Sequence, residues 1–264
     1  MKLITLNTHS LMENNYSHKL DVLTESIIKY IPDIIALQEV MQPIEGKIVG
    51  CNSYAGNIPI KVGNHALNIV DKLKKMSLVY NFVWLGFKKS YDKFEEGVAI
   101  LTPHKIKQID VVCASPFDDY NKWKTRKMLG VHILDEWYYS VHFGWWNDKE
   151  SSFQYELKRF MKAIEGKKAW ILGDFNSRDD ENDKGYNLAK KYGLIDSYEL
   201  AKIKDCGFTA YSNIDGWKKE STPEPIRIDY IFLTRKRKIE KHTTIFNGKD
   251  DERISDHNGI LVIT

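Results

Sequence analysis

Five short polar clusters contain the side chains best suited to chemistry, and each follows an apolar run. They are Asn7; Gln38-Glu39; His142; Gly173-Asp174-Phe175-Asn176; and Asp229 together with Ser255-Asp256-His257. Carboxylate and amide oxygens of this kind suit a hard cation such as Mg²⁺. Two histidines can move protons or stabilise a developing negative charge. The set therefore indicates metal-assisted hydrolysis of a phosphoester.

The apolar runs that precede these clusters are strand-like. They are Leu3 to Leu6, Ile34 to Leu37, Tyr138 to Val141, Ala169 to Leu172 and Ile226 to Ile228. Because the ends of several strands can meet at one edge of a sheet, we expect the polar side chains to converge on one pocket.

Helices and further strands are predicted around these five runs. Apolar residues at helical spacing predict helices over residues 17–31, 69–76 and 153–164, and more strands are predicted at 82–85, 98–101, 106–112, 127–133, 244–246 and 260–263. Strands outnumber the helices needed to cover a single parallel sheet. We therefore expect two packed sheets with helices on their outer faces. Residues 41–64, which follow Glu39, are predicted to form a long loop.

Asp174 and Asn176 are two residues apart in an extended segment, so their side chains point the same way. Gly173 would allow the backbone to turn tightly before them. A simple turn is the alternative interpretation, because Gly, Asp and Asn are common turn residues. Glu39 has a similar alternative as a solvated carboxylate at a strand end. The ordered set of clusters, and not any single one, favours a functional site.

Asp229 lies in an apolar segment and is predicted to be buried, where a carboxylate needs a positive or hydrogen-bonding partner. We expect His257 to be that partner. Asp229 would then fix one ring nitrogen of His257 and raise the basicity of the other. Glu96 is predicted to support His142 in the same way, with a solvated acidic turn as the alternative.

Composition and charge limit the class of protein. With 264 residues, 42% of them hydrophobic, and polar clusters in both halves, the chain is expected to form one domain over residues 1–264. A net charge of +3 fits phosphorylated substrates but does not by itself indicate a nucleic-acid-binding protein. The three cysteines lie far apart without metal-ligand spacing, and no apolar run approaches the ~20 residues of a membrane helix. We expect a soluble, cytoplasmic protein that does not bind a membrane.

Taken together, the clusters resemble the motifs of the endonuclease/exonuclease/phosphatase superfamily, from residue 3 to residue 263. Its members share an early Asn, a strand-terminal Glu, a central His, GD-x-N, a late Asp and SDH. The resemblance implies an α/β fold, a four-layer α/β/β/α sandwich of two packed sheets. It also implies that Glu39 binds a divalent cation with help from Asn7 and Asp256. The expected cation is Mg²⁺, with Mn²⁺ or Ca²⁺ as alternatives.

The resemblance also implies roles for the other residues. Asp174 and Asn176 would orient the attacking water and a phosphate oxygen. His257, supported by Asp229, would polarise the phosphate or accept the proton of the water, and His142 would stabilise the pentavalent charge. The sequence leaves open whether Asp174 or His257 is the general base. Phosphoryl transfer depends mainly on positioning and on neutralising charge, which such a set provides.

Several segments resemble the maltose 6'-phosphate phosphatase branch of this superfamily, namely residues 91–97, 123–127, 142–146 and 214–217. This resemblance implies a phosphomonoesterase that releases phosphate from a phosphorylated disaccharide by direct attack of activated water. Arg126 is then expected to bind the phosphate. Trp145, Trp146 and Trp217 are expected to stack on sugar rings. One of Trp145 and Trp146 could instead be core, because adjacent strand residues point to opposite faces.

Three other functions stay open. A DNA endonuclease or exonuclease would need a basic groove, for which residues 235–238 are the candidate, with a solvated hairpin tip as the alternative. A sphingomyelinase-like phosphodiesterase would need an apolar hairpin that enters a membrane, and none is evident. A non-catalytic sugar- or phosphate-binding module is disfavoured because Glu39, Asp174 and His257 are all present.

Overall fold

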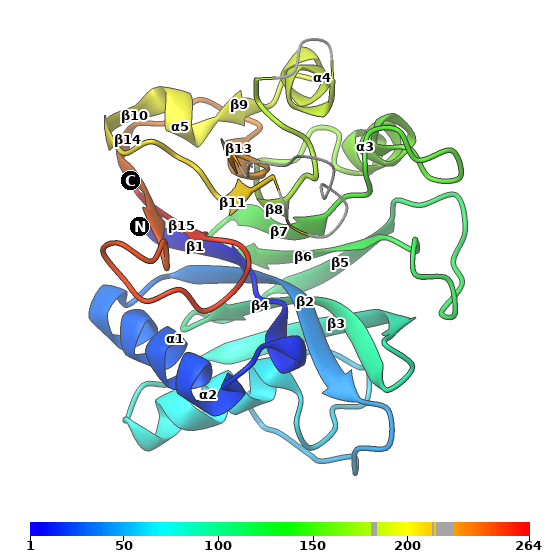
Figure 1. Cartoon of the computed structure of the whole chain (residues 1–264), viewed down its shortest axis with the longest axis vertical. Coiled ribbons are helices and arrows are strands. Elements are labelled where there is room, and N and C mark those ends of the chain that lie inside the picture. The colour runs from blue at the N-terminus through cyan, green and yellow to red at the C-terminus, as the bar shows by residue number, and fades with distance from the viewer. Residues whose placement is uncertain (181–183, 213, 215–223) are drawn as a thin grey trace.

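Two large β-sheets pack face to face, and helices cover the outer face of each (Figure 1). The computed structural model describes residues 1–180, 184–212, 214 and 224–264. Over these residues, one sheet has seven strands in the order β10-β14-β15-β1-β2-β4-β3. The other has six in the order β5-β6-β7-β8-β13-β9, and β11 pairs with β12 in a small separate sheet.

The bounds of the elements are as follows. The seven-stranded sheet contains β1 (Lys2–Asn7), β2 (Ile34–Pro43), β3 (Asn81–Ser90), β4 (Phe94–Thr102), β10 (Ala201–Lys204), β14 (Ile239–Ile245) and β15 (Gly259–Ile263). The six-stranded sheet contains β5 (Gln108–Cys113), β6 (Lys127–Ile133), β7 (Glu136–His142), β8 (Ala169–Asp174), β9 (Ile195–Asp196) and β13 (Asp229–Leu233). The remaining elements are η1 (Ser10–Met12), α1 (Tyr16–Tyr30), α2 (His65–Lys75), α3 (Phe153–Ala163), α4 (Gly185–Lys191), α5 (Ser197–Leu200), β11 (Ala210–Tyr211) and β12 (Pro225–Ile226).

Both faces of the central strands are buried, which explains why these strands are continuous apolar runs. On β1, Leu3 points into the core between the sheets, whereas Ile4 points to the core beneath α1 and α2. On β2, Ile34 and Ile35 divide between the two cores in the same way. The period of two along each strand thus supplies two apolar layers from one segment.

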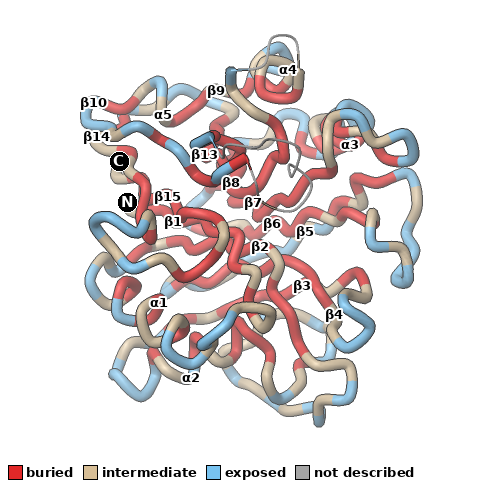
Figure 2. Tube along the Cα trace, viewed as in Figure 1, coloured by how far each residue is buried: buried red, intermediate tan, exposed pale blue. Residues whose placement is uncertain are grey.

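Each outer helix buries one face. In α1, Leu20, Leu23 and Ile27 lie at helical spacing and pack on the seven-stranded sheet. In α3, Phe153 and Leu157 pack on the six-stranded sheet, where α4 joins them. Figure 2 shows the buried trace concentrated in the two sheets and the exposed trace on loops and outer helix faces. The predicted four-layer sandwich is confirmed. No helix in the described ranges has the length and apolar character needed to cross a membrane.

Two predicted boundaries differ from the structure. The strand predicted to end before Glu39 runs on to Pro43, so the predicted loop begins later. The pairing of β2 with β4 shifts between Leu37 and Val40, which leaves a two-residue bulge at Gln38-Glu39. A bulge interrupts the alternation of apolar residues along a strand, so the sequence pattern predicted an end of the strand before Glu39. The run at Ile226 to Ile228 is divided between β12 and β13.

Candidate active site

Three neighbouring strands of the six-stranded sheet place three predicted residues side by side. His142 ends β7 and lies opposite Asp174, which ends the parallel strand β8. Asp229 begins the antiparallel strand β13 and lies opposite Asp174 on its other side. Residues directly opposite each other on paired strands point to the same face of a sheet. The side chains of His142, Asp174 and Asp229 therefore share one end of the sheet.

His257 reaches this group from the segment before β15. Its Nδ1 lies 2.8 Å from Oδ2 of Asp229, as predicted, and its Nε2 lies 3.9 Å from Oδ2 of Asp174. Nε2 of His142 lies 3.5 Å from the same Asp174 oxygen. Two imidazole rings thus face one buried carboxylate. The bond to Asp229 leaves Nε2 of His257 directed at the pocket.

Residues of the other sheet complete the group. Nδ2 of Asn7 donates to Oε1 of Glu39 over 3.0 Å and to Oδ2 of Asp174 over 3.1 Å. Glu39 sits in the β2 bulge with a φ of 53°. The bulge changes the direction of the Glu39 side chain, which points toward Asn7. Oγ of Ser255 donates to the backbone oxygen of Asn7 over 2.7 Å, which ties the segment of Asp256 to the end of β1.

The buried ionisable groups of the site shift one another's pKa values. Burial, reinforced by the neighbouring Asp229 carboxylate, raises the pKa of Asp174 to about 7, although His257 opposes the shift. Burial disfavours the imidazolium of His257, yet Asp229 and Asp174 hold its pKa well above the usual value. Burial, with Arg126 nearby, holds the pKa of His142 well below its usual value. At neutral pH the site thus pairs a charged His257 with a neutral His142.

The donor set fits a hard divalent cation. Burial and the like charges of Glu96 and Asp256 raise the pKa of Glu39, so negative charge converges here without enough positive charge to balance it. Oδ1 of Asp229 is buried and has no hydrogen-bond partner among the described residues. Oxygen donors grouped in this way are what Mg²⁺, Mn²⁺ and Ca²⁺ bind. Glu39, Asp256 and Asn7 stay the predicted ligands of such an ion.

A cavity of about 240 Å³ is lined by Glu39, Asp256, Asp174, His142 and His257, whereas Asn7 and Asp229 support these residues from behind its wall. The further lining residues include His9, Lys88, Ser90, Tyr91 and Trp123. His9 lies only two residues after Asn7, so the sequence could have suggested that His9 also lines the site. Lys88 could not be found this way, because it reaches the site through the pairing of β3 with β4.

The predicted supporting residue Glu96 takes a different partner. Its Oε1 lies 2.7 Å from Nζ of Lys88, and both side chains are buried. No hydrogen bond joins Glu96 to His142 in the part of the chain that the structure describes. Lys88 faces Glu96 across paired strands, and the ammonium is the stronger partner for a buried carboxylate. Glu96 therefore lines the pocket without orienting His142 directly.

The predicted substrate residues divide into three cases. Arg126 and Trp145 line the cavity. Trp146 does not, because it packs against Phe153 and the core beneath α3. Both tryptophans lie in the loop after β7, which ends at His142, so the strand alternation expected from the sequence is not what separates them. Trp217 lies outside the described residues.

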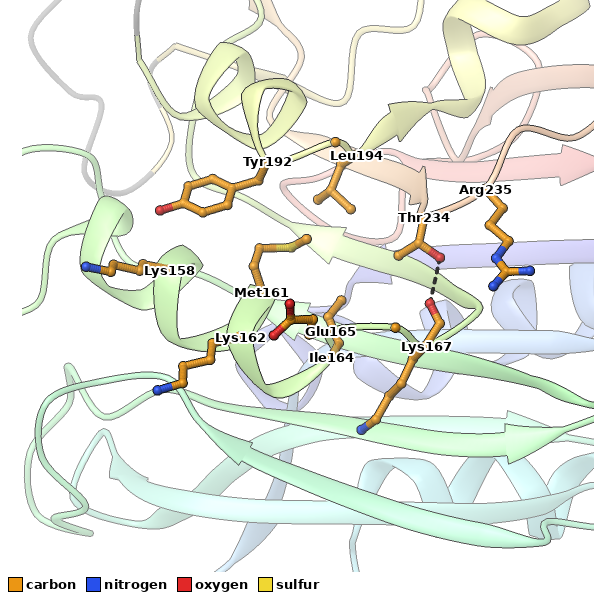
Figure 3. Close-up of a pocket in the computed structure, with 12 residues that line it drawn as sticks. Lys158, Met161, Lys162, Ile164, Glu165, Lys167, Tyr192, Leu194, Thr234 and Arg235 are labelled. Carbon is orange, nitrogen blue, oxygen red and sulfur yellow. Dashed lines mark hydrogen bonds between the residues drawn. The ribbon is translucent and has the colours of Figure 1, made fainter.

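A larger cavity, of about 630 Å³, lies between the ends of α3 and α4 (Figure 3). Its wall includes Lys167, which precedes β8, and Thr234, which follows β13. It therefore lies at the opposite end of these strands from Asp174 and Asp229. It contains none of the predicted site residues, so size alone does not mark the chemical site here.

The fold and the arrangement of these side chains are those of a metal-dependent hydrolase. The chain belongs to the endonuclease/exonuclease/phosphatase family, whose model matches residues 4–257. A family protein from Leptotrichia buccalis has a similar structure, with a TM-score of 0.88 and 30% identity over 100% of this chain and 98% of that one. No protein with a curated description matches this chain by sequence.

Two less similar structures share the fold. One is the mannosyl-6-phosphatase Bt3783 of Bacteroides thetaiotaomicron, with a TM-score of 0.68 and 16% identity over 100% of this chain and 98% of that one. The other is D. rerio TDP2 complexed with single-strand DNA product, with a TM-score of 0.66 and 18% identity over 99% and 97% of the two chains. At this identity the likeness concerns the fold alone.

Proposed function

We propose that this protein is a Mg²⁺-dependent phosphomonoesterase that removes phosphate from a phosphorylated sugar. One observation carries the proposal. The Arg126 guanidinium is buried in the cavity wall, where it donates only to the backbone oxygens of Trp123 and Thr125, over 2.9 and 3.2 Å. Among the described residues, its Nε has no hydrogen-bond partner and no ion pair joins the guanidinium to a carboxylate, although its charge favours ionisation of the buried Glu156 and Glu96 carboxyl groups. A buried guanidinium with an unpartnered N–H and no direct ion pair can bind an anion, and a phosphate would supply it.

A phosphomonoester fits this charge better than a phosphodiester. A terminal phosphate carries a charge of about −1.5 to −2 at pH 7, whereas a diester carries only one. Arg126 and the charged His257 lie in the same cavity as Asn176, so the second negative charge would have a partner there. The cavity would thus favour a terminal phosphate.

The chain's own residues would carry out the hydrolysis as follows. Glu39, Asp256 and Asn7 would hold the ion, which would polarise a phosphate oxygen and neutralise its charge. Asp174, whose pKa is near 7, accepts a proton as water attacks phosphorus. The bond between phosphorus and the sugar oxygen breaks, the sugar oxygen takes up a proton from solvent water and leaves as an alcohol, and Asp174 returns its proton to solvent. Charged His257 and neutral His142 bond the phosphate oxygens as charge shifts onto them.

An aromatic wall supports a sugar as the leaving group. The rings of Trp123 and Trp145 lie 5.7 Å apart at 59°, and both line the cavity. Trp123 is 50% exposed, so its indole ring is accessible to a ligand in the cavity. Indole faces stack on the apolar faces of sugar rings, and a disaccharide such as maltose 6'-phosphate would offer two rings. The sugar phosphatase with the same fold supports this choice.

Among the described residues, the basic run that a nuclease would need does not adjoin the cavity. The basic run at residues 235–238 follows β13, at the end of that strand away from Asp229. Within it, Arg237 pairs with Glu136 and Lys238 with Glu240. The run therefore does not extend the cavity that contains the reactive groups, which favours a small substrate.

The test is release of inorganic phosphate, with Mg²⁺, from a panel of phosphorylated mono- and disaccharides that includes maltose 6'-phosphate. Nicking of a supercoiled plasmid is measured in parallel. We expect selective release from a sugar phosphate, abolished by Glu39→Ala and by His257→Ala with the fold retained. Plasmid nicking without phosphate release would move the function to a nuclease. Full activity in either variant would refute the site.

A further inference from the structure

The carboxamide of Asn176 is held by two groups of fixed hydrogen-bonding character. The indole Nε1–H of Trp145 donates to Oδ1 of Asn176 over 2.9 Å, and Nδ2 of Asn176 donates to the backbone oxygen of Phe143 over 2.9 Å. An indole nitrogen only donates and a carbonyl oxygen only accepts. The two ends of the carboxamide therefore cannot exchange places without setting oxygen against oxygen and hydrogen against hydrogen.

This arrangement determines what Asn176 offers the cavity. Its Nδ2 carries two hydrogens, of which Phe143 takes one. Its backbone N–H is already bound to Oδ1 of Asp174, over 2.8 Å. The side chain lines the same cavity as His142 and His257. The second Nδ2 hydrogen is thus the free donor of Asn176, and a phosphate oxygen in the cavity could accept it.

The Trp145 ring approaches Asn176 from a loop that is itself anchored. The backbone N–H of Gly144 donates to Oε2 of the buried Glu156 over 2.7 Å. The backbone oxygen of Trp145 accepts from the N–H of Phe153, the first residue of α3, over 3.3 Å. On its other side the ring meets Trp123. These contacts fix the direction of the indole N–H.

We propose that Trp145 is a positioning residue for the hydrolytic step, because its indole N–H holds the Asn176 carboxamide with Nδ2 toward the transferring phosphoryl group. The inference rests on the proposed phosphatase function and deepens it. Trp145 also forms part of the aromatic wall, so a sugar ring that contacts it touches the group that orients Asn176. Sugar recognition and phosphate positioning therefore meet in one side chain.

The test is a double-mutant cycle on the Mg²⁺-loaded protein. Trp145→Phe keeps an aromatic ring and removes the N–H donor. We expect kcat to fall about 3- to 10-fold, the value of one neutral hydrogen bond, with a smaller change in KM. In the Asn176→Ala background the same substitution should cause no further fall in kcat, because the carboxamide is gone. Trp146→Phe is the matched control, since Trp146 packs in the core, and its kcat should stay at the wild-type value.

Two results would overturn the positioning role. One is an equal fall in kcat for Trp145→Phe in both backgrounds, and the other is a change confined to KM. Thermal unfolding of each variant separates these results from a loss of fold. If the wild-type protein released no phosphate from any sugar phosphate, the proposed function would fail instead. The cycle would then be measured on the phosphoester that the protein does hydrolyse.

Discussion

One oxygen atom, Oδ2 of Asp174, is the meeting point of the site. It accepts a hydrogen bond from Nδ2 of Asn7, and it faces Nε2 of both His142 and His257 at 3.5 and 3.9 Å. These partners come from β1, β7 and the segment before β15. The contacts of this one oxygen therefore depend on how the two sheets are placed relative to each other. The sequence motif identified Asp174 as one residue among several. Its central position follows only from the register of β8 with its neighbours.

Asp229→Asn is expected to impair catalysis while leaving the fold intact. The wild-type carboxylate keeps His257 protonated to a higher pH, because it holds the pKa of the imidazolium well above the usual value. Without that charge the pKa falls, so the alkaline limb of the pH profile of kcat/KM should move to lower pH. We expect kcat to fall about 100-fold or more, as for the loss of one donor that stabilises charge in the transition state. An unmoved alkaline limb would contradict the role of Asp229.

Lys88→Met is expected to destabilise the fold. Burial opposes ionisation of Glu96, yet Lys88 holds the pKa of this carboxyl below its usual value. Removing the ammonium leaves an unpaired buried carboxylate, which costs about 3–5 kcal/mol. The midpoint of thermal or urea unfolding measures this loss. The double variant Lys88→Met/Glu96→Gln should recover part of the lost stability. If it were only as stable as the single variant Lys88→Met, the result would argue against the ion pair.

Among the elements, β2 carries the Glu39 carboxylate on a β-bulge. Glu39 lies inside β2 and not at its end, and the bulge there turns the side chain toward Asn7. The neighbouring Gln38 is fully buried and donates from Nε2 to Oγ of Ser140, on β7 of the other sheet, over 2.9 Å. The bulge thus sends one residue to the site and another to the contact between the sheets.

Gly173 shows why β8 needs a glycine immediately before Asp174. Its φ is +147°, and a Cβ at this position would lie 2.0 Å from the backbone oxygen of Val141 on β7. The residue therefore allows close contact between strands and not the turn that the sequence suggested. We expect Gly173→Ala to cost about 2–4 kcal/mol of stability from strain and forced backbone shifts.

The same substitution should lower activity, because Asp174 moves with its strand. Gly50→Ala is the control, since a Cβ at Gly50 would meet nothing within 4 Å. Urea unfolding and phosphate release are measured for both variants. Equal stability of Gly173→Ala and Gly50→Ala would exclude the proposed strain.

Elements with strong periodic patterns could be predicted from the sequence. The helix predicted over residues 17–31 is α1, and the run at Leu3 to Leu6 is β1. The short elements α4 and β9 to β11 were not predicted, because a few residues carry too little periodicity to distinguish them from loops. For the site, ordered motifs were sufficient to find the polar residues. The partner of Glu96 was not predictable, because it depends on which residue of β3 lies opposite.

Across the whole molecule, two buried histidines away from the cavity make stability depend on pH. Burial lowers the pKa of both His65 and His242 to about 3. The unfolded chain, with a histidine pKa near 6.5, therefore binds more protons than the folded one below that pH. Stability is complete above about pH 6.5 and falls as the pH drops toward 3, by about 2 kcal/mol per histidine at pH 5.

His242→Leu should remove one of these two contributions. We expect its loss of stability between pH 7.5 and pH 5 to be about 2 kcal/mol smaller than that of the wild type. The exposed His18, changed to Leu, is the control and should keep the wild-type loss. Urea unfolding at both pH values measures the difference. If His242→Leu lost as much stability between these pH values as the wild type, the His242 imidazole would not contribute to destabilisation by acid.

The pairing of β1 with β15 has a consequence for biosynthesis. Lys2 lies opposite Ile263, and β15 is placed between β14 and β1 inside the sheet. Because β1 leaves the ribosome well before β15, its edge toward β15 stays unpaired in the meantime. Asn7 likewise meets Ser255 only when residues near 255 have emerged. A nascent chain would have no working site until synthesis reaches this region, and its unpaired edge would be open to pairing with other chains until then.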